Sequence, residues 1–574
     1  MKPIIACSLI VGCMFISLRV NAQAPVFNKV WEKMCGSEGF EQTDGFKFMQ
    51  TDDSGYIYIC TRTGSGIPSG TKYDPSCYLY DSVATNDIWM FKLDSNGNQI
   101  WDRAIGGLKS DYFGSLINDV NGDFLLIGAS NSNPSCEKTQ SAYNNKLDGW
   151  IVKINKDSAV IWDKRLGSKE VDLFGFGAVA TDGSIIATGY TESSYPNNDI
   201  SDSTNGWDDI MVFKLDSNGN KVWNYQYGSF GHEFVSDIIA LSNEQYLVIG
   251  YTDGTNNGDV TEPSLSFPLT GKFREDNWVI KIDSAGNKIW DRRYGCLTAD
   301  DYSGPSLFDS NGDVVIGGSL GFTNFPQNMY PCNDGVADTV ARGAWDAWIY
   351  KIDTANGNIK NEKRFGGDFN DDICQIVEMT DKGYLLACKS NSNAGFEKSE
   401  NRVANVDPNN YDFWIVRMDS VFNIIWDKTI GGSWGEQCPN VIALSDSTFI
   451  IAGQTGYGIS GDIGVATIDT TSGWPRGDIW VAKWYIANPL QMQELSLASF
   501  NLYPNPAQDV VYVTLQNAKK TEYNFTVQNM TGESIVNQKV IYNNNQTIVV
   551  PTASWPPGVY VINIEGVTRK LVKL

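Results

Sequence analysis

A pattern of 60 to 70 residues, repeated seven times between Val30 and Trp484, constrains the fold of this 574-residue chain more than any other feature. Each unit has a Trp-containing strand, a Gly turn, an acidic residue, a hairpin and a strand that begins Asp-x-Trp. The Asp-x-Trp strands begin at Asp87, Asp148, Asp208, Asp276, Asp346, Asp412 and Asp478, and Ile210 replaces the tryptophan in the third unit. The period is too long for a helical or leucine-rich solenoid, and it fits one four-stranded propeller blade with a long loop.

Tight turns indicate how the strands pair. Each Asp-x-Trp strand is followed by a short turn, such as Asp94-Ser-Asn-Gly-Asn98, and then by the Trp strand of the next unit. Because Asn-Gly accepts positive φ at both central turn positions, the two flanking strands are predicted to be neighbours. With the inner hairpin they make four strands. In this register the last blade lacks its fourth strand, and the first Trp strand, at Val30-Trp31, is available to supply it and remove a free edge.

The sequence therefore predicts an all-β chain with two folded domains. We expect a seven-bladed β-propeller at residues 23–486, closed by its N-terminal strand, then a linker at 487–497 and a small β-rich domain at 498–574. Aromatic residues at 12% and 55 glycines fit a β-rich protein with many turns. Twelve of the 18 tryptophans occupy the two signature positions, where we expect packing between blades rather than a carbohydrate-stacking array.

The N-terminus and the charge predict export and exclude some partners. Residues 1–22 contain a short apolar run, Ile4 to Leu18, followed by small-residue cleavage sites, which is typical of a signal peptide. No other segment is long and apolar enough to predict a transmembrane helix. The net charge of −23 lies almost entirely in the repeats and disfavours binding to nucleic acid.

Cysteines and histidine limit the chemistry. Nine cysteines follow the signal peptide, and the pairs Cys77–Cys136 and Cys374–Cys388 are both candidates for disulfides in an oxidising compartment. His232 is the single histidine, so a site with several His ligands is excluded. A polysaccharide hydrolase or lyase needs only two carboxylates, but 67 acidic residues leave the choice of a pair open, and no catalytic residue is predicted.

An acidic residue recurs five positions after the signature glycine. These residues are Glu41, Asp111, Asp172, Glu233, Asp300, Asp371 and Glu436. They are expected on one face of the propeller, either as a ring that binds cations or a substrate, or as acceptors for backbone amides where the chain crosses between blades. Since an asymmetric ligand rarely needs seven equal contacts, the structural interpretation is favoured.

The long loops before the Asp-x-Trp strands are where the units differ most. Clustered oxygen donors in the third and fourth loops, including Asp199, Asp202, Asp259 and Glu262, make Ca²⁺ a possible cofactor, and solvated turns explain the same residues equally well. Loop aromatics either line a surface for a glycan or a protein or, taken singly, cover the top of the propeller, and the second interpretation is favoured for each one. They are Tyr78, Tyr80, Tyr195, Trp207, Phe325, Tyr330 and Trp474.

Ordered motifs in the last 77 residues carry a resemblance to a known family. They are Tyr503-Pro-Asn-Pro506 (residues Tyr503, Pro504, Asn505 and Pro506), the strand of Gly558 and Tyr560, and a terminal run with Lys570 and Lys573. This segment resembles the type A C-terminal sorting domain of proteins exported by the type IX secretion system of Bacteroidota. The resemblance implies an Ig-like sandwich of seven strands, passage through the outer membrane by the type IX secretion machinery, and release or attachment at the cell surface.

Three functions fit these features. The first is a secreted or surface-attached module whose loop face binds a glycan or a surface protein. The second is an extracellular polysaccharide hydrolase or lyase that uses carboxylates in the central channel. The third is a structural subunit of a surface assembly. The repeated positions serve packing and turning, so the function is expected where the seven copies differ.

Overall fold

The computed structural model describes residues 25–43, 47–64, 68–77, 85–265, 275–295, 301–321, 342–403, 407, 409–456, 458–468, 477–487, 499–516, 522–529, 534–541, 547–564 and 567–574. Contacts divide the chain into two compact units, one at Lys29–Tyr485 and one that contains Ile486–Leu574. The predicted signal peptide and nearly all of the predicted linker lie outside the described residues. The described part includes no helix with the length and apolarity needed to cross a membrane.

In its described residues, the first unit contains seven sheets, and five of these take four consecutive antiparallel strands. They are β7–β10 (Asp111–Asn118, Phe124–Ser130, Asp148–Ile154, Val160–Leu166), β11–β14 (Asp172–Val179, Ile185–Thr191, Asp209–Leu215, Lys221–Tyr227), β15–β18 (Glu233–Ala240, Tyr246–Thr252, Asp276–Ile282, Lys288–Tyr294), β19–β22 (Asp301–Phe308, Val314–Gly321, Trp345–Ile352, Ile359–Phe365) and β23–β26 (Asp371–Glu378, Tyr384–Ser390, Asp412–Met418, Ile424–Ile430). A short 3-10 helix, Tyr143–Asn145, precedes β9.

The two remaining sheets contain the start and the end of the unit. One has the order β2-β4-β5-β6, with β3 also paired to β4; the strands are β2 (Glu41–Gln42), β3 (Met49–Thr51), β4 (Ile57–Thr63), β5 (Asp87–Leu93) and β6 (Gln99–Ile105). The other has the order β1-β29-β28-β27, in which β1 (Val26–Cys35) lies beside β29 (Asp478–Ala487), followed by β28 (Thr448–Thr455) and β27 (Glu436–Ser445). The first strand of the unit thus completes its last sheet.

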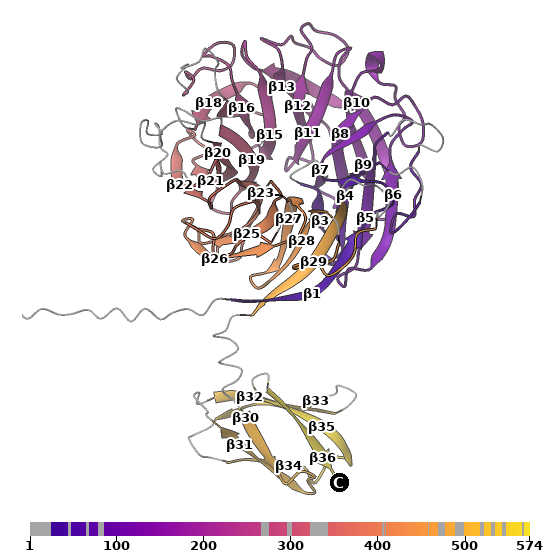
Figure 1. Ribbon diagram of the computed structural model, residues 1–574. Helices are drawn as coiled ribbons and strands as arrows, with labels where there is room; N and C mark the ends of the chain where they lie inside the picture. Colours follow the sequence, from indigo (N-terminus) through magenta and orange to yellow (C-terminus); the bar gives the residue numbers. More distant parts are fainter. Residues whose placement is uncertain are drawn as a thin grey trace, which may run out of the picture. The chain divides into compact units, whose positions relative to one another are not determined.

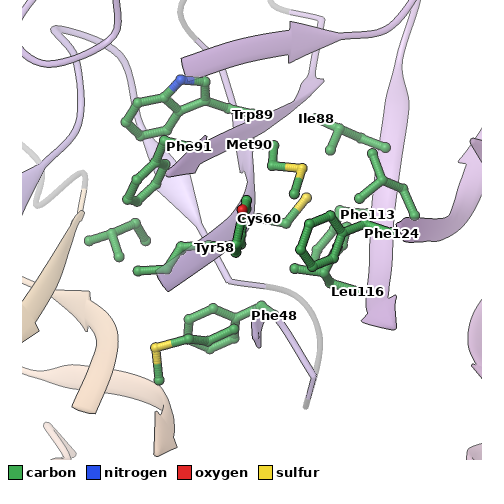
Figure 2. Close-up of a cluster of buried hydrophobic side chains, with 14 of the residues drawn as sticks. Phe48, Tyr58, Cys60, Ile88, Trp89, Met90, Phe91, Phe113, Leu116 and Phe124 are labelled. Carbon is green, nitrogen blue, oxygen red and sulfur yellow. The ribbon is translucent and has the colours of Figure 1, made fainter. Parts of the chain in front are cut away.

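The sheets surround a common centre, with first strands such as β7, β11 and β15 nearest to it (Figure 1). Third strands such as β5 and β9 are buried along their whole length. The hydrophobic core lies between neighbouring sheets: Ile117 and Ile127 of one sheet pack with Phe174 and Met211 of the next. Figure 2 shows an equivalent cluster, in which Trp89 lies in the same buried group as Phe113 of the following sheet. This is a propeller-like arrangement of β-sheets.

The Asp-x-Trp tryptophans pack between neighbouring sheets, as the sequence predicts. Six of them are buried, and each donates from its indole Nε1 to a carboxylate on the outer strand of the same sheet at 2.9–3.2 Å. The pairs are Trp89–Asp102, Trp150–Asp163, Trp278–Asp291, Trp348–Glu362, Trp414–Asp427 and Trp480–Glu32. The last pair joins β29 to β1. A buried indole N–H needs an acceptor, which explains why an acid recurs after the tryptophan of the outer strand.

The sheet of β11–β14 corrects one prediction. Met211, and not Ile210, occupies the tryptophan position, because Met211 pairs with Gln226 as Trp150 pairs with Arg165. Because two aspartates are adjacent in the sequence, the sequence does not show which of them begins β13. The strand begins at Asp209. With no indole N–H to satisfy, the outer strand carries Asn224 where other sheets have an acid. The two substitutions therefore belong together.

One disulfide prediction is confirmed and one is wrong. Cys77 and Cys136 are bonded, which joins loops of two neighbouring sheets. Cys374 and Cys388 are free and buried. Residue 374 lies in a β-bulge between Ile373 and Gln375, so Ile373 rather than Cys374 stands opposite Cys388.

The C-terminal unit has two sheets in its described residues. One has the order β30-β31-β34 (Ser499–Tyr503, Val510–Gln516, Thr547–Pro551), and the other has the order β33-β32-β35-β36 (Ser534–Ile541, Glu522–Asn529, Gly558–Ile564, Val567–Lys573). Phe500 and Val513 of the first sheet share one buried core with Phe525 and Ile562 of the second. Two sheets enclose a single core, as in a small β-sandwich.

Candidate functional site

One end of the sheets in the first unit gathers the residues that differ between repeats. In the sheet of β15–β18, Glu233, Thr252 and Asp276 are aligned across three strands, and equivalent rows exist in the other sheets. The turns that lead into the inner strands and the long loops before the third strands therefore meet at this end.

The recurring acids lie in this row and are buried. Each of five accepts a hydrogen bond from the backbone N–H four residues earlier, at 2.5–3.0 Å. The pairs are Glu41–Ser37, Asp111–Gly107, Asp172–Ser168, Glu233–Ser229 and Asp371–Gly367. Glu436 is equally buried and accepts from the Thr455 hydroxyl at 2.9 Å. These contacts satisfy backbone amides at the crossing between sheets and favour a structural role.

The fifth acid is displaced by one residue from its predicted place. Asp300 lies outside the described residues, and Asp301 is the buried first residue of β19. In the sequence, Gly295 and Asp301 are six positions apart, whereas the other signature glycines and their acids are five apart, so a count of five from Gly295 stops one position short.

The Asp-x-Trp acids form a second buried set at the same end. Asp87 accepts from the Cys77 amide at 3.0 Å, and Asp209 accepts from the Asn205 amide at 2.7 Å, so each holds a long loop. Gly106 lies between Asp87 and Asp111: a Cβ there would be 2.5 Å from one carboxylate and 2.8 Å from the other. The signature glycine is therefore required by the close approach of two acids.

Burial of these acid pairs changes their ionisation. Burial raises the pKa of Asp111 to about 7, and the charge of Asp87 adds to the effect. Burial likewise raises the pKa of Glu41 to about 8, with a contribution from Asp478. Two buried carboxylates at close range favour retention of a proton.

In two sheets a buried arginine lies beside the aspartate of the Asp-x-Trp strand. Arg293 donates to Asp276 at 2.8 Å, and Arg364 donates to Asp346 at 2.6 Å. In the sheets of β11–β14 and β23–β26 the equivalent residues are Gln226 and Thr429. The acids are constant, whereas the means of balancing their charge varies.

One residue beyond the first acid, the repeats no longer share one residue type. The position holds Gln42, Tyr112, Leu173, Phe234, Tyr302, Asp372 and Gln437, and its partners on the second strand are Arg62, Ala129, Tyr190, Tyr251, Ser319, Lys389 and Gln454. Apolar and aromatic residues concentrate in the sheets of β7–β22, and polar residues occupy the others. The end of the ring is therefore divided into an aromatic part and a polar part.

Seven rings make one continuous aromatic arc, defined as Trp207, His232, Phe234, Tyr190, Tyr251, Tyr302 and Trp345. Phe234 is 6.4 Å from His232, 5.4 Å from Tyr190 and 5.4 Å from Tyr251 between ring centroids. At one end Trp207 stacks on His232 at 6.1 Å. At the other, Tyr302 lies 5.1 Å from Tyr251 and 5.2 Å from Trp345. The arc spans three sheets.

Two hollows adjoin the arc. The Tyr251 hollow has a volume of about 310 Å³ and is lined by Arg62, Tyr112, Tyr190, Phe234 and Tyr251, with residues 113–114, 173–176, 189 and 235. Arg62 lies 5.4 Å above the ring of Tyr112. The Trp207 hollow has a volume of about 420 Å³ and is lined by Glu192, Ser194, Thr204, Gly206, Trp207 and Asp208. Both combine aromatic faces with polar groups, which is the composition of a ligand site.

The centre of the ring is occupied by a segment of the chain. Lys47 forms an isolated parallel β-bridge with Ser115 of β7, and its ammonium pairs with Asp237 of β15 at 2.6 Å. The Phe48 amide donates to the side chain of Asn440 in β27 at 3.0 Å. Asp237 also accepts from the Ser306 hydroxyl at 2.6 Å. This carboxylate on an inner strand is thus fully engaged.

The predicted calcium ligands are spread over two loops and engaged in local contacts. Asp199 accepts from the Gly167 amide at 3.3 Å, and Asp202 accepts from the Ser203 amide at 2.8 Å. Asp259 accepts from the Gly228 amide at 3.2 Å, and Glu262 accepts from the Arg293 amide at 2.8 Å. Over the described ranges, no group of three or more Asp, Glu, His or Cys residues is placed to hold a metal ion.

Of the predicted loop aromatics, two lie in the described residues. Trp207 is 71% exposed and begins the arc, and Tyr195 is 51% exposed in the same loop. Tyr78, Tyr80, Phe325, Tyr330 and Trp474 lie outside the described residues. The remaining members of the arc were missed, although one signal was present: the position next to an invariant acid changes from repeat to repeat.

The motif residues of the C-terminal unit meet at its last strand. Asn505 donates to the Lys570 carbonyl at 2.7 Å and accepts from the Val572 amide at 2.9 Å. Tyr503 is exposed, Pro504 and Pro506 flank Asn505, and Lys573 is buried beside Ala507. Tyr560, two residues after Gly558, packs against Trp555 at 5.0 Å between ring centroids. The motif anchors the chain end to the start of this domain.

Comparison with known proteins assigns the C-terminal unit. A family model described as a secretion system C-terminal sorting domain matches residues 501–574. This segment is a sorting domain, and it directs the chain to export by type IX secretion. No curated protein matches the chain.

Solved structures show distant similarity over the larger unit. A protein of unknown function from Dyadobacter fermentans is 10% identical, with 80% of this chain and 99% of that chain covered at a TM-score of 0.38. The WD40 domain of Pan2 from Neurospora crassa is 7% identical, with 80% and 95% covered at a TM-score of 0.37. A GH43 β-xylosidase/α-arabinofuranosidase from a compost microbial metagenome is 9% identical, with 49% and 84% covered at a TM-score of 0.25. These values assign no ligand or activity to the chain.

Proposed function

We propose that the chain is an exported binding module that holds a glycan on the aromatic arc. The observation that carries this proposal is the position of the arc. Its central members, Phe234, Tyr190, Tyr251 and Tyr302, lie in a row whose residues differ between repeats, directly beside acids that all repeats share. A fold needs the shared row, whereas the divergent row is available for one asymmetric ligand.

The chemistry of the arc suits a sugar. Flat aromatic faces pack against the C–H faces of pyranose rings, while hydroxyls require acceptors and donors nearby. Arg62, Tyr190 and Tyr251 line the Tyr251 hollow, and Glu192 and Asp208 line the Trp207 hollow. A chain of stacked rings over three sheets accommodates an oligosaccharide rather than a single sugar.

The framework that we propose for this module is a seven-bladed β-propeller over residues 23–486. The pairing of β1 with β29 and the Trp480–Glu32 bond support closure of the ring by the N-terminal strand. An Ig-like sandwich at 498–574, after a linker at 487–497 and with residues 1–22 as the signal peptide, completes the proposed chain. The module would act as a secreted or outer-surface protein, and fractionation of cells and medium separates the two locations.

A glycan array with the full mature chain tests the proposal, and it is run with and without EDTA. Binding to a defined oligosaccharide that survives EDTA is expected. Trp207→Ala and Tyr251→Ala are then expected to weaken that binding about tenfold or more, since buried aromatic anchors dominate binding energy. Tyr73→Ala is the matched control, because Tyr73 is an exposed tyrosine outside the arc. Binding that is absent throughout, or equal in all variants, contradicts the proposal.

A further inference from the structure

The two hollows beside the arc carry opposite charges. The guanidinium of Arg62 belongs to the Tyr251 hollow. The carboxylates of Glu192 and Asp208 belong to the Trp207 hollow, together with the hydroxyls of Ser194 and Thr204. An oligosaccharide that crosses both would therefore meet a positive end and a negative end.

The hollows are adjacent through Tyr190. This residue lines the Tyr251 hollow, and it is half-buried on β12. Burial raises the pKa of its hydroxyl, and the charges of Asp208 and Glu192 raise it further. Both carboxylates of the Trp207 hollow thus lie near this ring, and the stack Trp207–His232–Phe234 runs alongside.

The Trp207 hollow presents an open aromatic face next to negative charge. The Trp207 side chain is largely exposed, and its indole stacks on the His232 ring with 6.1 Å between ring centroids. His232 Nδ1 is 2.8 Å from Asp208 Oδ2, which fixes this carboxylate beside the indole. Glu192 is exposed, and the neighbouring cation Lys146 is paired with Glu170. A cation over an indole and near two carboxylates gains both cation–π and ionic attraction.

We infer that the Trp207 hollow takes the protonated primary amine of an amino-sugar residue, with the neighbouring sugars extending over Tyr190 and Tyr251. This inference rests on the proposed function and adds the ligand class. The net charge of −23 agrees with a basic ligand, because an acidic surface attracts cations over several ångströms and repels polyanions.

Calorimetric titration of the full mature chain tests the inference with three short oligomers of equal length and linkage: glucosamine, N-acetylglucosamine and glucose. The pH is set low enough to protonate the glucosamine amine. We expect glucosamine oligomers to bind about tenfold more tightly than either neutral series, since one cation–π contact plus exposed ion pairs is of this size. High salt is expected to reduce the preference.

Charge-neutral variants locate the amine. Glu192→Gln is expected to reduce the preference for glucosamine severalfold, because it removes one negative charge from the Trp207 hollow. The affinity for the glucose oligomer is expected to stay the same, because Glu192 is exposed and its substitution should not disturb the fold. Asp157→Asn is the matched control, since it removes the same charge from an exposed turn at the other end of the sheets. Trp207→Ala is expected to weaken all three oligomers.

The outcomes separate the inference from the proposed function. If the neutral oligomers bind as tightly as glucosamine and depend on Trp207, the amine assignment is overturned and the glycan module stands. If no oligosaccharide binds but poly-lysine does, in a manner that depends on Trp207 and Glu192, both are overturned in favour of a basic peptide. A preference that Asp157→Asn reduces as much as Glu192→Gln reflects net charge alone and also overturns the amine site.

Discussion

Glu233 and Phe234 are adjacent in the chain and belong to two rows of opposite character. Glu233 is buried, accepts from the Ser229 amide at 2.9 Å and from the Thr252 hydroxyl at 2.5 Å, and has an acid as its counterpart in every repeat. Phe234 points to the other face of the same strand and joins the aromatic arc, and its counterparts range from Asp372 to Tyr302. The alternation of a β-strand thus separates the residues that hold the ring from the residues that face a ligand.

The largest effect on stability is expected from removal of a buried arginine that neutralises one of the buried acids. Arg293→Met leaves the Asp276 carboxylate buried without its partner and is expected to lower the free energy of unfolding by about 3–5 kcal/mol. Urea unfolding followed by circular dichroism measures the change. Arg292→Met is the matched control: Arg292 is 40% exposed and pairs with Glu262, so its loss is expected to cost no more than about 1 kcal/mol.

A smaller effect is expected from a pair of neighbouring residues, one from each row. Asp111→Ala removes the acceptor of the buried Gly107 amide and is expected to cost about 1–3 kcal/mol. Tyr112→Ala changes a partly exposed ring in the Tyr251 hollow and is expected to cost less than Asp111→Ala, while it weakens glycan binding. Thermal unfolding and calorimetric titration on both variants test the division. Equal stability losses would show that the two rows are not functionally distinct.

The pH dependence of stability tests the ionisation of the row. The folded pKa of Glu41 is about 8 against an ordinary value of 4.5, so the folded state binds more protons between these values. Its contribution is complete below about pH 4.5 and is lost as the pH rises through 8, at up to about 1.4 kcal/mol per pH unit. Relative to the wild type, Glu41→Gln should therefore gain stability between pH 5 and pH 8. A relative loss over this range would contradict the assignment.

The smallest effect on stability is expected at the exposed end of the arc. Trp207→Ala should change the free energy of unfolding by no more than about 0.5 kcal/mol, because the side chain is 71% exposed. Its effect on glycan affinity should nevertheless be among the largest of all variants. Thermal unfolding measured beside calorimetry reports both quantities, and a large drop in unfolding temperature would move Trp207 from the ligand row to the structural one.

Much of the framework follows from the sequence because the repeat is specified by residues that are close together in the chain. Turn residues such as Asn96-Gly97 specify hairpins, and the period of 60 to 70 residues specifies four strands and a loop. The burial of the tryptophans and the Cys77–Cys136 bond were also predictable, since equivalent residues in successive repeats occupy equivalent places. The sorting domain could be read from ordered motifs alone.

The exact strand position of individual residues could not be predicted from the sequence, and three positions show why. Asp209 rather than Asp208 begins β13, Asp301 holds the place predicted for Asp300, and the bulge at Cys374 moves it away from Cys388. A bulge or an added turn residue leaves the repeat recognisable and shifts the side chains that follow it by one place.

The sequence by itself determined the repeat, its strand order and the acids common to all copies, because each of these depends on contacts within one unit or between neighbours. Only the tertiary structure decided that Trp207, Phe234, Tyr251 and Trp345 form one arc. These residues lie up to 138 positions apart, by subtraction of 207 from 345, and no local pattern links them. The arrangement of the sheets around a common centre brings them together, because the same end of every sheet lies on one face of the first unit.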